Sequence, residues 1–103
     1  MFALHPYFEN LAANELILDV RTQGEFLEGH VPNAKHIPVN QVVNHVSELG
    51  KFKTVYVYCH SGSRSTVACQ MLETLGLSNL VCVNEGGFPD WEGAGFTCSS
   101  EIL

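Results

Sequence analysis

The segment Thr54-Val-Tyr-Val-Tyr-Cys-His-Ser-Gly-Ser-Arg-Ser65 joins a predicted strand to a predicted helix through a short polar loop. Its first five residues are β-branched or aromatic, as is typical of a strand, and the apolar residues that follow have helical spacing. Cys59 therefore lies where the strand ends and the helix begins. Unpaired N–H groups at a helix start stabilise an anion, and Gly62 lets the loop turn several of them inward. Together with the positive charge of Arg64, this position favours the thiolate of Cys59.

The segments on either side predict further strands and helices in alternation. Apolar runs suited to buried strands of a parallel sheet occupy Leu16 to Val20 and Leu80 to Val83. Helical apolar stripes are formed by Val42, Val43, Val46 and Leu49, and by Val67, Ala68, Met71, Leu72 and Leu75; a weaker pattern spans Phe8 to Ala13. The sequence thus predicts an α/β fold with a small, mainly parallel sheet and helices on both of its faces.

Three segments that follow predicted strands are expected to meet at the carboxyl end of the sheet, where ligands bind in such folds. They are Asp19-Val-Arg21, the loop Cys59 to Ser65, and the tight turn Glu85-Gly86-Gly87. Thr22 and Glu25 have the spacing of a capping box, which predicts a short helix after Arg21 that Gly29 ends. We expect Asp19 to accept hydrogen bonds from loop amides and Arg21 to pair with Glu25. Glu85, Gly86 and Gly87 would let the chain pass close to the site.

The composition limits the classes of function. The 103 residues are sufficient for one domain, expected to span 1–103, and the net charge of −6 with only five Lys and Arg residues argues against nucleic-acid or anionic-membrane binding. The first residues show neither a signal-peptide pattern nor a membrane span, so a cytoplasmic protein is expected. The four cysteines (59, 69, 82 and 98) contain no Cys-x-x-Cys pair. We therefore predict no disulfide framework and no metal site, and Cys69 and Cys82 are interpreted as core residues.

Four motifs in order resemble the single-domain rhodaneses, a family of sulfurtransferases. They are Asp19-Val-Arg21 with Glu25-Phe26, Gly29-His-Val-Pro-Asn-Ala34, Cys59-His-Ser-Gly-Ser-Arg-Ser65, and Glu85-Gly-Gly-Phe-Pro-Asp-Trp91. The resemblance implies a rhodanese-like fold in which Cys59 takes a sulfane sulfur from a small anionic donor such as thiosulfate. Cyanide, a thiol or a protein would then remove the sulfur, without a cofactor.

The donor would be bound by the loop residues of that resemblance, namely His60, Ser61, Gly62, Ser63, Arg64 and Ser65. Inward amides and Arg64 can hold both a thiolate and the persulfide formed from it. The residue after the cysteine is often basic in the family. Here it is His60, whose charge near neutral pH depends on its surroundings.

Two other functions use the same features. Cysteine-dependent phosphatases also hold a thiolate in an amide loop, but they place five residues between cysteine and arginine, and here only His60, Ser61, Gly62 and Ser63 intervene. A non-catalytic rhodanese-like binding module is the second alternative. Such modules commonly lack the cysteine, which this chain retains. Sulfur transfer is therefore the preferred hypothesis.

Overall fold

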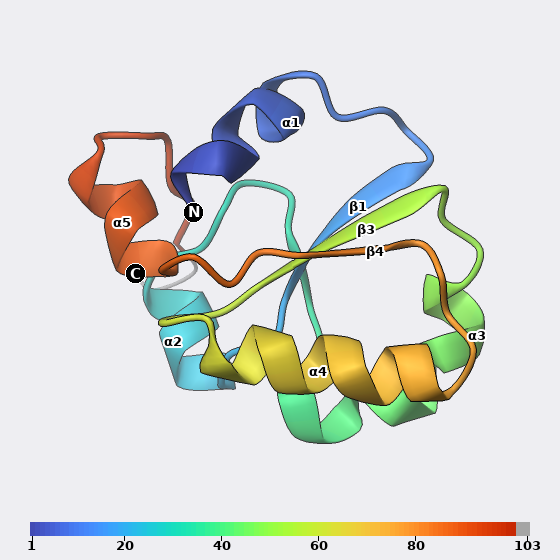
Figure 1. Ribbon diagram of the computed structural model, residues 1–103. Coiled ribbons are helices and arrows are strands. Elements are labelled where there is room, and N and C mark those ends of the chain that lie inside the picture. The colour runs from blue at the N-terminus through green and yellow to red at the C-terminus, as the bar shows by residue number, and fades with distance from the viewer. Residues whose placement is uncertain (101–103) are drawn as a thin grey trace.

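Four parallel strands form one sheet in the order β2-β1-β3-β4 (Figure 1). The computed structural model describes residues 1–100. The strands are β1 (Glu15–Asp19), β2 (Lys35–His36), β3 (Thr54–Tyr58) and β4 (Leu80–Cys82). The helices are η1 (Phe2–Leu4), α1 (His5–Glu9), α2 (Gln23–Glu28), η2 (Val39–His45), α3 (Val46–Leu49), α4 (Ser63–Thr74) and α5 (Phe88–Gly93).

The alternation of side chains along β1 and β3 divides the core into two layers. One face of the sheet carries Leu18, Val55 and Val57, which are buried under η2, α3 and α4. The opposite face carries Ile17, Tyr56 and Tyr58, which are buried under η1, α1 and α5 together with Trp91 and Phe88. Figure 1 shows α4 and α1 on opposite sides of the sheet. The predicted parallel α/β fold with helices on both faces is confirmed.

Several local predictions are also confirmed. The strand Thr54–Tyr58 has the predicted bounds. Thr22 caps α2: its hydroxyl accepts a hydrogen bond from the backbone N–H of Glu25, and the Glu25 carboxylate accepts one from the N–H of Thr22. Gly29 follows the last residue of that helix. These elements depend on short-range interactions, which the sequence pattern reports directly.

Three of the predictions about secondary structure are wrong. The first helix spans His5–Glu9 and not residues 8–13, because Pro6 lies in its first turn, where its fixed φ suits a helix start. Val67 on α4 and Leu75 just after it are about half exposed, and Cys69 is buried instead. The strand β4 is not a buried strand: it lies at the sheet edge, where Val81 faces solvent.

The register of β1 and β3 decides where the site forms. Asp19 pairs with Tyr58, so the two strands end side by side and the segments after them leave the sheet together. Both side chains lie on the same face, and the Tyr58 hydroxyl donates a 2.7 Å hydrogen bond to the Asp19 carboxylate. The same hydroxyl accepts a bond from the N–H of Val31, which joins the turn after α2 to the sheet.

We predict that Tyr58→Phe lowers the free energy of unfolding by roughly 1–3 kcal/mol, because it leaves the buried Val31 N–H without its acceptor. Urea unfolding of the wild type and the variant measures the difference. Tyr56→Phe is the matched control, since the Tyr56 hydroxyl makes a longer, partly buried bond to Glu15 at the other end of the sheet. Equal losses for the two variants would contradict the role of Tyr58.

Candidate active site

The sulfur of Cys59 lies inside the loop that joins β3 to α4. The backbone N–H of Gly62 donates to Sγ at 3.0 Å, and the thiol donates to the Ser65 hydroxyl at 3.5 Å. Burial raises the pKa of this thiol, but hydrogen bonds from the Ser65 side chain and from the backbone N–H groups of Ser65, Gly62 and Ser61 outweigh it. The net pKa of Cys59 therefore lies below its ordinary value. The loop stabilises a thiolate without exposing it to solvent.

The Ser65 hydroxyl can adjust to both protonation states of Cys59. It is buried and lies 3.0 Å from the Gly62 carbonyl and 3.1 Å from the Val83 carbonyl, either of which can accept its single proton. While it donates to a carbonyl, its oxygen accepts from the neutral thiol. When Cys59 ionises, the hydroxyl can rotate so that its proton points at the sulfur and no longer at either carbonyl. Ser65 is thus a stabiliser of the anion that sequence alone placed only among the donor-binding residues.

Two glycines allow the loop to contact the segment after β4. Gly62 has a φ of +100°, and a Cβ there would collide with the carbonyl of Asn84. A Cβ at Gly87 would collide with the carbonyls of His60 and Cys59. The N–H of Phe88 then donates to the Cys59 carbonyl at 3.0 Å. Side chains at these two positions would force the Cys59 loop away from the segment after β4.

Asp90 and the ammonium of Met1 hold the backbone of the turn Glu85 to Gly87 in place. Gly86 has a φ of +77° and lies against the Asp90 carboxylate, which accepts a hydrogen bond from the N–H of Gly87. The carbonyl of Glu85 accepts a 2.6 Å bond from the ammonium of Met1, while the Glu85 side chain is exposed. The turn therefore contacts the loop through its backbone and not through a carboxylate.

Arg64 and Glu25 form an ion pair across the opening between α4 and α2. The guanidinium nitrogens Nη1 and Nη2 donate to the two carboxylate oxygens at 2.5 and 2.9 Å. This pairing, acting against partial burial, lowers the pKa of Glu25 to about 2. His60 approaches the same carboxylate, with Nδ1 3.8 Å from Oε2. The expected pairing of Glu25 with Arg21 is wrong, because Arg64 occupies both carboxylate oxygens.

Arg21 instead pairs with Asp19 in the interior. Its Nη2 donates to the Asp19 carboxylate at 2.7 Å and to the Gly29 carbonyl at 2.6 Å, and its backbone N–H also donates to Asp19. Its guanidinium carbon lies 4.4 Å from the centre of the Phe88 ring. Burial lowers the pKa of Arg21, but the bond to Asp19 outweighs this effect, so the group remains charged. The donors to Asp19 are thus Arg21 and Tyr58, and no bond from the Cys59 loop amides is seen among the described residues.

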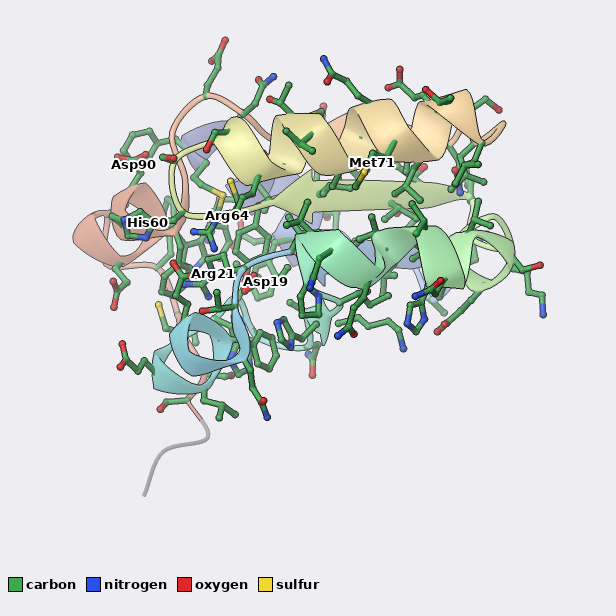
Figure 2. All side chains as sticks on the ribbon, turned by 90° about the horizontal axis from the view of Figure 1, so that it is seen from below. Asp19, Arg21, His60, Arg64, Met71 and Asp90 are labelled. Atoms are coloured by element: carbon green, nitrogen blue, oxygen red, sulfur yellow. The ribbon has the colours of Figure 1, made fainter. Side chains whose placement is uncertain are left out.

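The labelled side chains show how these groups gather. In Figure 2, Asp19, Arg21, His60 and Arg64 lie at one end of the sheet, where α2, α5 and the start of α4 meet. Ser61 and Ser63 are exposed, and their hydroxyls lie 3.4 Å apart. The structure thus brings together the predicted loop, Glu25, and the Glu85 to Gly87 turn, while Asp19 and Arg21 lie behind them.

Tyr58 and Phe88 also belong to the site, although neither is among the predicted site residues. Tyr58 anchors Asp19, and Phe88 covers Arg21 and binds the Cys59 carbonyl through its N–H. A signal for Tyr58 exists in the sequence: Asp19 and Tyr58 each lie at the end of a predicted strand, just before a predicted site segment. For Phe88 the sequence offers only its place in the Glu85 to Trp91 motif, because its contact depends on how the chain returns after β4.

A pocket of about 170 Å³ opens beside the loop and is lined by Arg21, Glu25, Glu28, Gly29, His60, Phe88, Pro89 and Glu92. A larger pocket of about 410 Å³ lies between η1 and β4; it reaches Glu85 but not Cys59.

Within residues 1–100, no group of three His, Cys, Asp or Glu side chains has an arrangement that could hold a metal ion. None of the helices in this part of the chain is both long and apolar enough to cross a membrane.

Known proteins are similar to this chain in sequence and in fold. The family model for the rhodanese-like domain matches residues 6–94. A sulfurtransferase of Allochromatium vinosum is 34% identical over 76 residues, covering 74% of this chain and 70% of that protein. YrkF of Bacillus subtilis, which is named as a candidate sulfur carrier protein, is 36% identical over 77 residues, covering 75% of this chain. A rhodanese-related protein of Thermoplasma volcanium has a TM-score of 0.77 at 30% identity, covering 93% of this chain and 90% of that one.

The match covers only part of some relatives. It spans 41% of the length of YrkF and 60% of the length of YqhL, another protein of Bacillus subtilis. These relatives therefore contain segments that have no counterpart in the matched residues.

We predict that Ser65→Ala raises the pKa of Cys59, because the variant removes the side-chain bond to the thiolate. The pH dependence of alkylation by iodoacetamide measures that pKa. Thr66→Ala is the matched control: the Thr66 hydroxyl also donates to the Gly62 carbonyl, at 2.8 Å, but makes no bond to the sulfur. A Ser65→Ala profile identical to the wild type would show that the backbone amides alone set the ionisation.

We also predict that Glu25→Gln removes a pH-dependent part of the stability. The pKa of Glu25 is lowered from 4.5 to about 2, so its contribution is fully present above pH 4.5 and is lost as the pH falls through about 2. Allowing for solvent screening, we expect a difference of about 1–2 kcal/mol in the free energy of unfolding near pH 6. The difference should shrink towards pH 2. Gln keeps the capping box, and Glu28→Gln, at an exposed position, serves as the control.

Proposed function

Because the chain belongs to the rhodanese-like domain family, we propose that it is a sulfurtransferase in which Cys59 carries the transferred sulfur as a persulfide. The observation that carries this proposal is the position of Sγ, which receives a hydrogen bond from Gly62 N–H and lies beside Ser65 at the start of α4. The relatives named as sulfurtransferases support sulfur transfer in general. The donor, the acceptor and the covalent intermediate are parts of the proposal.

In the first step, the Cys59 thiolate attacks the outer sulfur of a sulfane-sulfur donor. A new sulfur–sulfur bond forms at Cys59, the sulfur–sulfur bond of the donor breaks, and its electron pair leaves with the remainder of the donor. With thiosulfate, the leaving group is sulfite, and the total charge of the reacting groups is the same before and after. The lowered pKa of Cys59 provides the nucleophile, so no general base is required.

The persulfide that results needs the same kind of support as the thiolate. Its terminal sulfur carries negative charge, and the inward N–H groups of the loop are suitable donors. In the second step, an acceptor such as cyanide, a thiol or a protein attacks the terminal sulfur and returns Cys59 to the thiolate. The cycle is therefore a ping-pong reaction that uses no cofactor. By analogy with the YrkF name, a sulfur carrier protein is one candidate for the exchange partner.

The phosphatase alternative is less well supported by the geometry. A phosphate group would need a guanidinium inside the loop to pair with its oxygens. Here the Arg64 guanidinium is bound to both oxygens of Glu25. The binding-module alternative does not require the lowered pKa of Cys59, and this feature favours an enzyme.

The test is sulfur loading measured by intact-protein mass spectrometry. After incubation with thiosulfate or an alkyl persulfide, the wild type should gain the mass of one sulfur atom, and cyanide should remove it. Cys59→Ser should gain none. Cys98→Ser is the matched control, because Cys98 is an exposed thiol outside the loop and its loss should leave the loading intact.

Failure of the wild type to load from either class of donor would overturn the proposed function. Hydrolysis of an aryl phosphate under those conditions would favour a phosphatase. Binding of a partner that survives Cys59→Ser, without loading of the wild type, would favour a binding module.

A further inference from the structure

The side chains beside the Cys59 loop, here called its mouth, are Glu25, His60 and Arg64, and their arrangement disfavours binding of a doubly charged anion. Arg64 is the arginine of the loop, and its guanidinium is bound to both carboxylate oxygens of Glu25, while the His60 ring approaches the same carboxylate. The low pKa of Glu25 keeps its carboxylate ionised at neutral pH. A donor anion could use the Arg64 guanidinium only by displacing this carboxylate.

The adjacent pocket adds further negative charge. Glu28 and Glu92 line it, and no cation pairs with either side chain within residues 1–100. Arg21 also lines it, but Asp19 balances the charge of its guanidinium. Phe88 and Pro89 add apolar surface to the lining. The volume of about 170 Å³ is enough for a small organic group. The pocket therefore suits an uncharged or cationic carbon chain better than a sulfonate.

The charge on the reacting groups differs between donor classes. Attack of the thiolate on thiosulfate gathers three negative charges at the loop, one from Cys59 and two from the donor. Attack on an alkyl persulfide gathers two when the persulfide is ionised and one when it is protonated. In the protonated case the proton stays on the transferred sulfur, and the electron pair of the broken bond leaves with the alkyl thiolate. Repulsion by Glu25 therefore costs more with thiosulfate.

Resting on the proposed transfer through Cys59, we infer that the natural sulfur donor is an alkyl persulfide with an uncharged or cationic carbon chain, and that Glu25 is the residue that sets this specificity. Glu25 does so by occupying Arg64 and by placing its own charge at the mouth of the loop. Glu28 and Glu92, which line the same pocket, act in the same direction without pairing with Arg64. Arg64 still orders the loop through its pairing with α2.

The experiment compares donors that differ mainly in charge. The hydropersulfides of cysteamine, 2-mercaptoethanol and mercaptoacetate have similar size and carry an ammonium, a hydroxyl and a carboxylate. The second-order rate constant for sulfur loading of Cys59, followed by rapid quench and mass spectrometry, should fall in that order and be lowest for thiosulfate. Raising the salt concentration should reduce the differences, because the carboxylates of the pocket are partly exposed.

Substitutions of single carboxylates identify the residue that disfavours loading from thiosulfate. Glu25→Gln should raise loading from thiosulfate by about tenfold relative to loading from 2-mercaptoethanol hydropersulfide, because it removes one charge and releases Arg64. Glu28→Gln removes one charge from the same pocket but releases no arginine, so its effect should be about two- to threefold. Glu73→Gln, on the exposed surface of α4, should leave the ratio unchanged.

A second variant keeps the inference testable if Glu25→Gln does not fold. His60→Lys adds a permanent charge at an exposed position and should also raise the relative rate with thiosulfate. Equal rates for the donors of the charge series, or equal effects of Glu25→Gln and Glu73→Gln, would overturn the inference and leave sulfur transfer standing. Absence of loading from every donor would instead overturn the proposed function.

Discussion

The buried ion pair between Asp19 and Arg21 is the interaction on which the functional end of this molecule depends. It lies at the end of β1, receives the Tyr58 hydroxyl from β3, and binds the Gly29 carbonyl at the end of α2. The ring of Phe88, at the start of α5, packs against the guanidinium of Arg21. Loss of one partner from such a pair leaves an uncompensated buried charge and typically costs about 3–5 kcal/mol. Two strands and two helices are therefore held in place by one charge pair.

The chemistry of Cys59 results from competition between burial and hydrogen bonding. Burial alone would favour the neutral thiol, and the loop reverses this preference with amide and hydroxyl donors. These donors keep their positions because Gly62 fits against Asn84 and Gly87 fits against the loop carbonyls. The reactivity of the thiol thus depends on a segment more than twenty residues further along the chain. Arg64 contributes indirectly, since its charge is balanced by Glu25.

Much of the fold followed from the sequence, because the elements concerned are stabilised by local interactions. The strand Thr54–Tyr58, the Thr22 capping box and the parallel sheet with helices on both faces were predicted from periodicity and capping. The strand β4 was predicted to be buried because its residues are apolar, but apolarity does not distinguish an edge strand from a central one. Likewise, the spacing of Val67 and Leu75 fits a helix, while the face that is buried depends on what packs against it.

The sequence by itself determined the position of Cys59 between a strand and a helix, the glycines around it and the family resemblance, because these are properties of neighbouring residues. Only the tertiary structure decided which acid each arginine meets. Arg21, near Glu25 in the sequence, turns inward to Asp19, and Arg64 crosses from α4 to reach Glu25. The physical reason is that ion pairing depends on distance in space and on burial, which are set by the register of β1 and β3 and by where the chain places α2 and α4 after these strands. The fold therefore sets the negative charge of Glu25 beside the Cys59 loop, on which the inferred choice of donor depends.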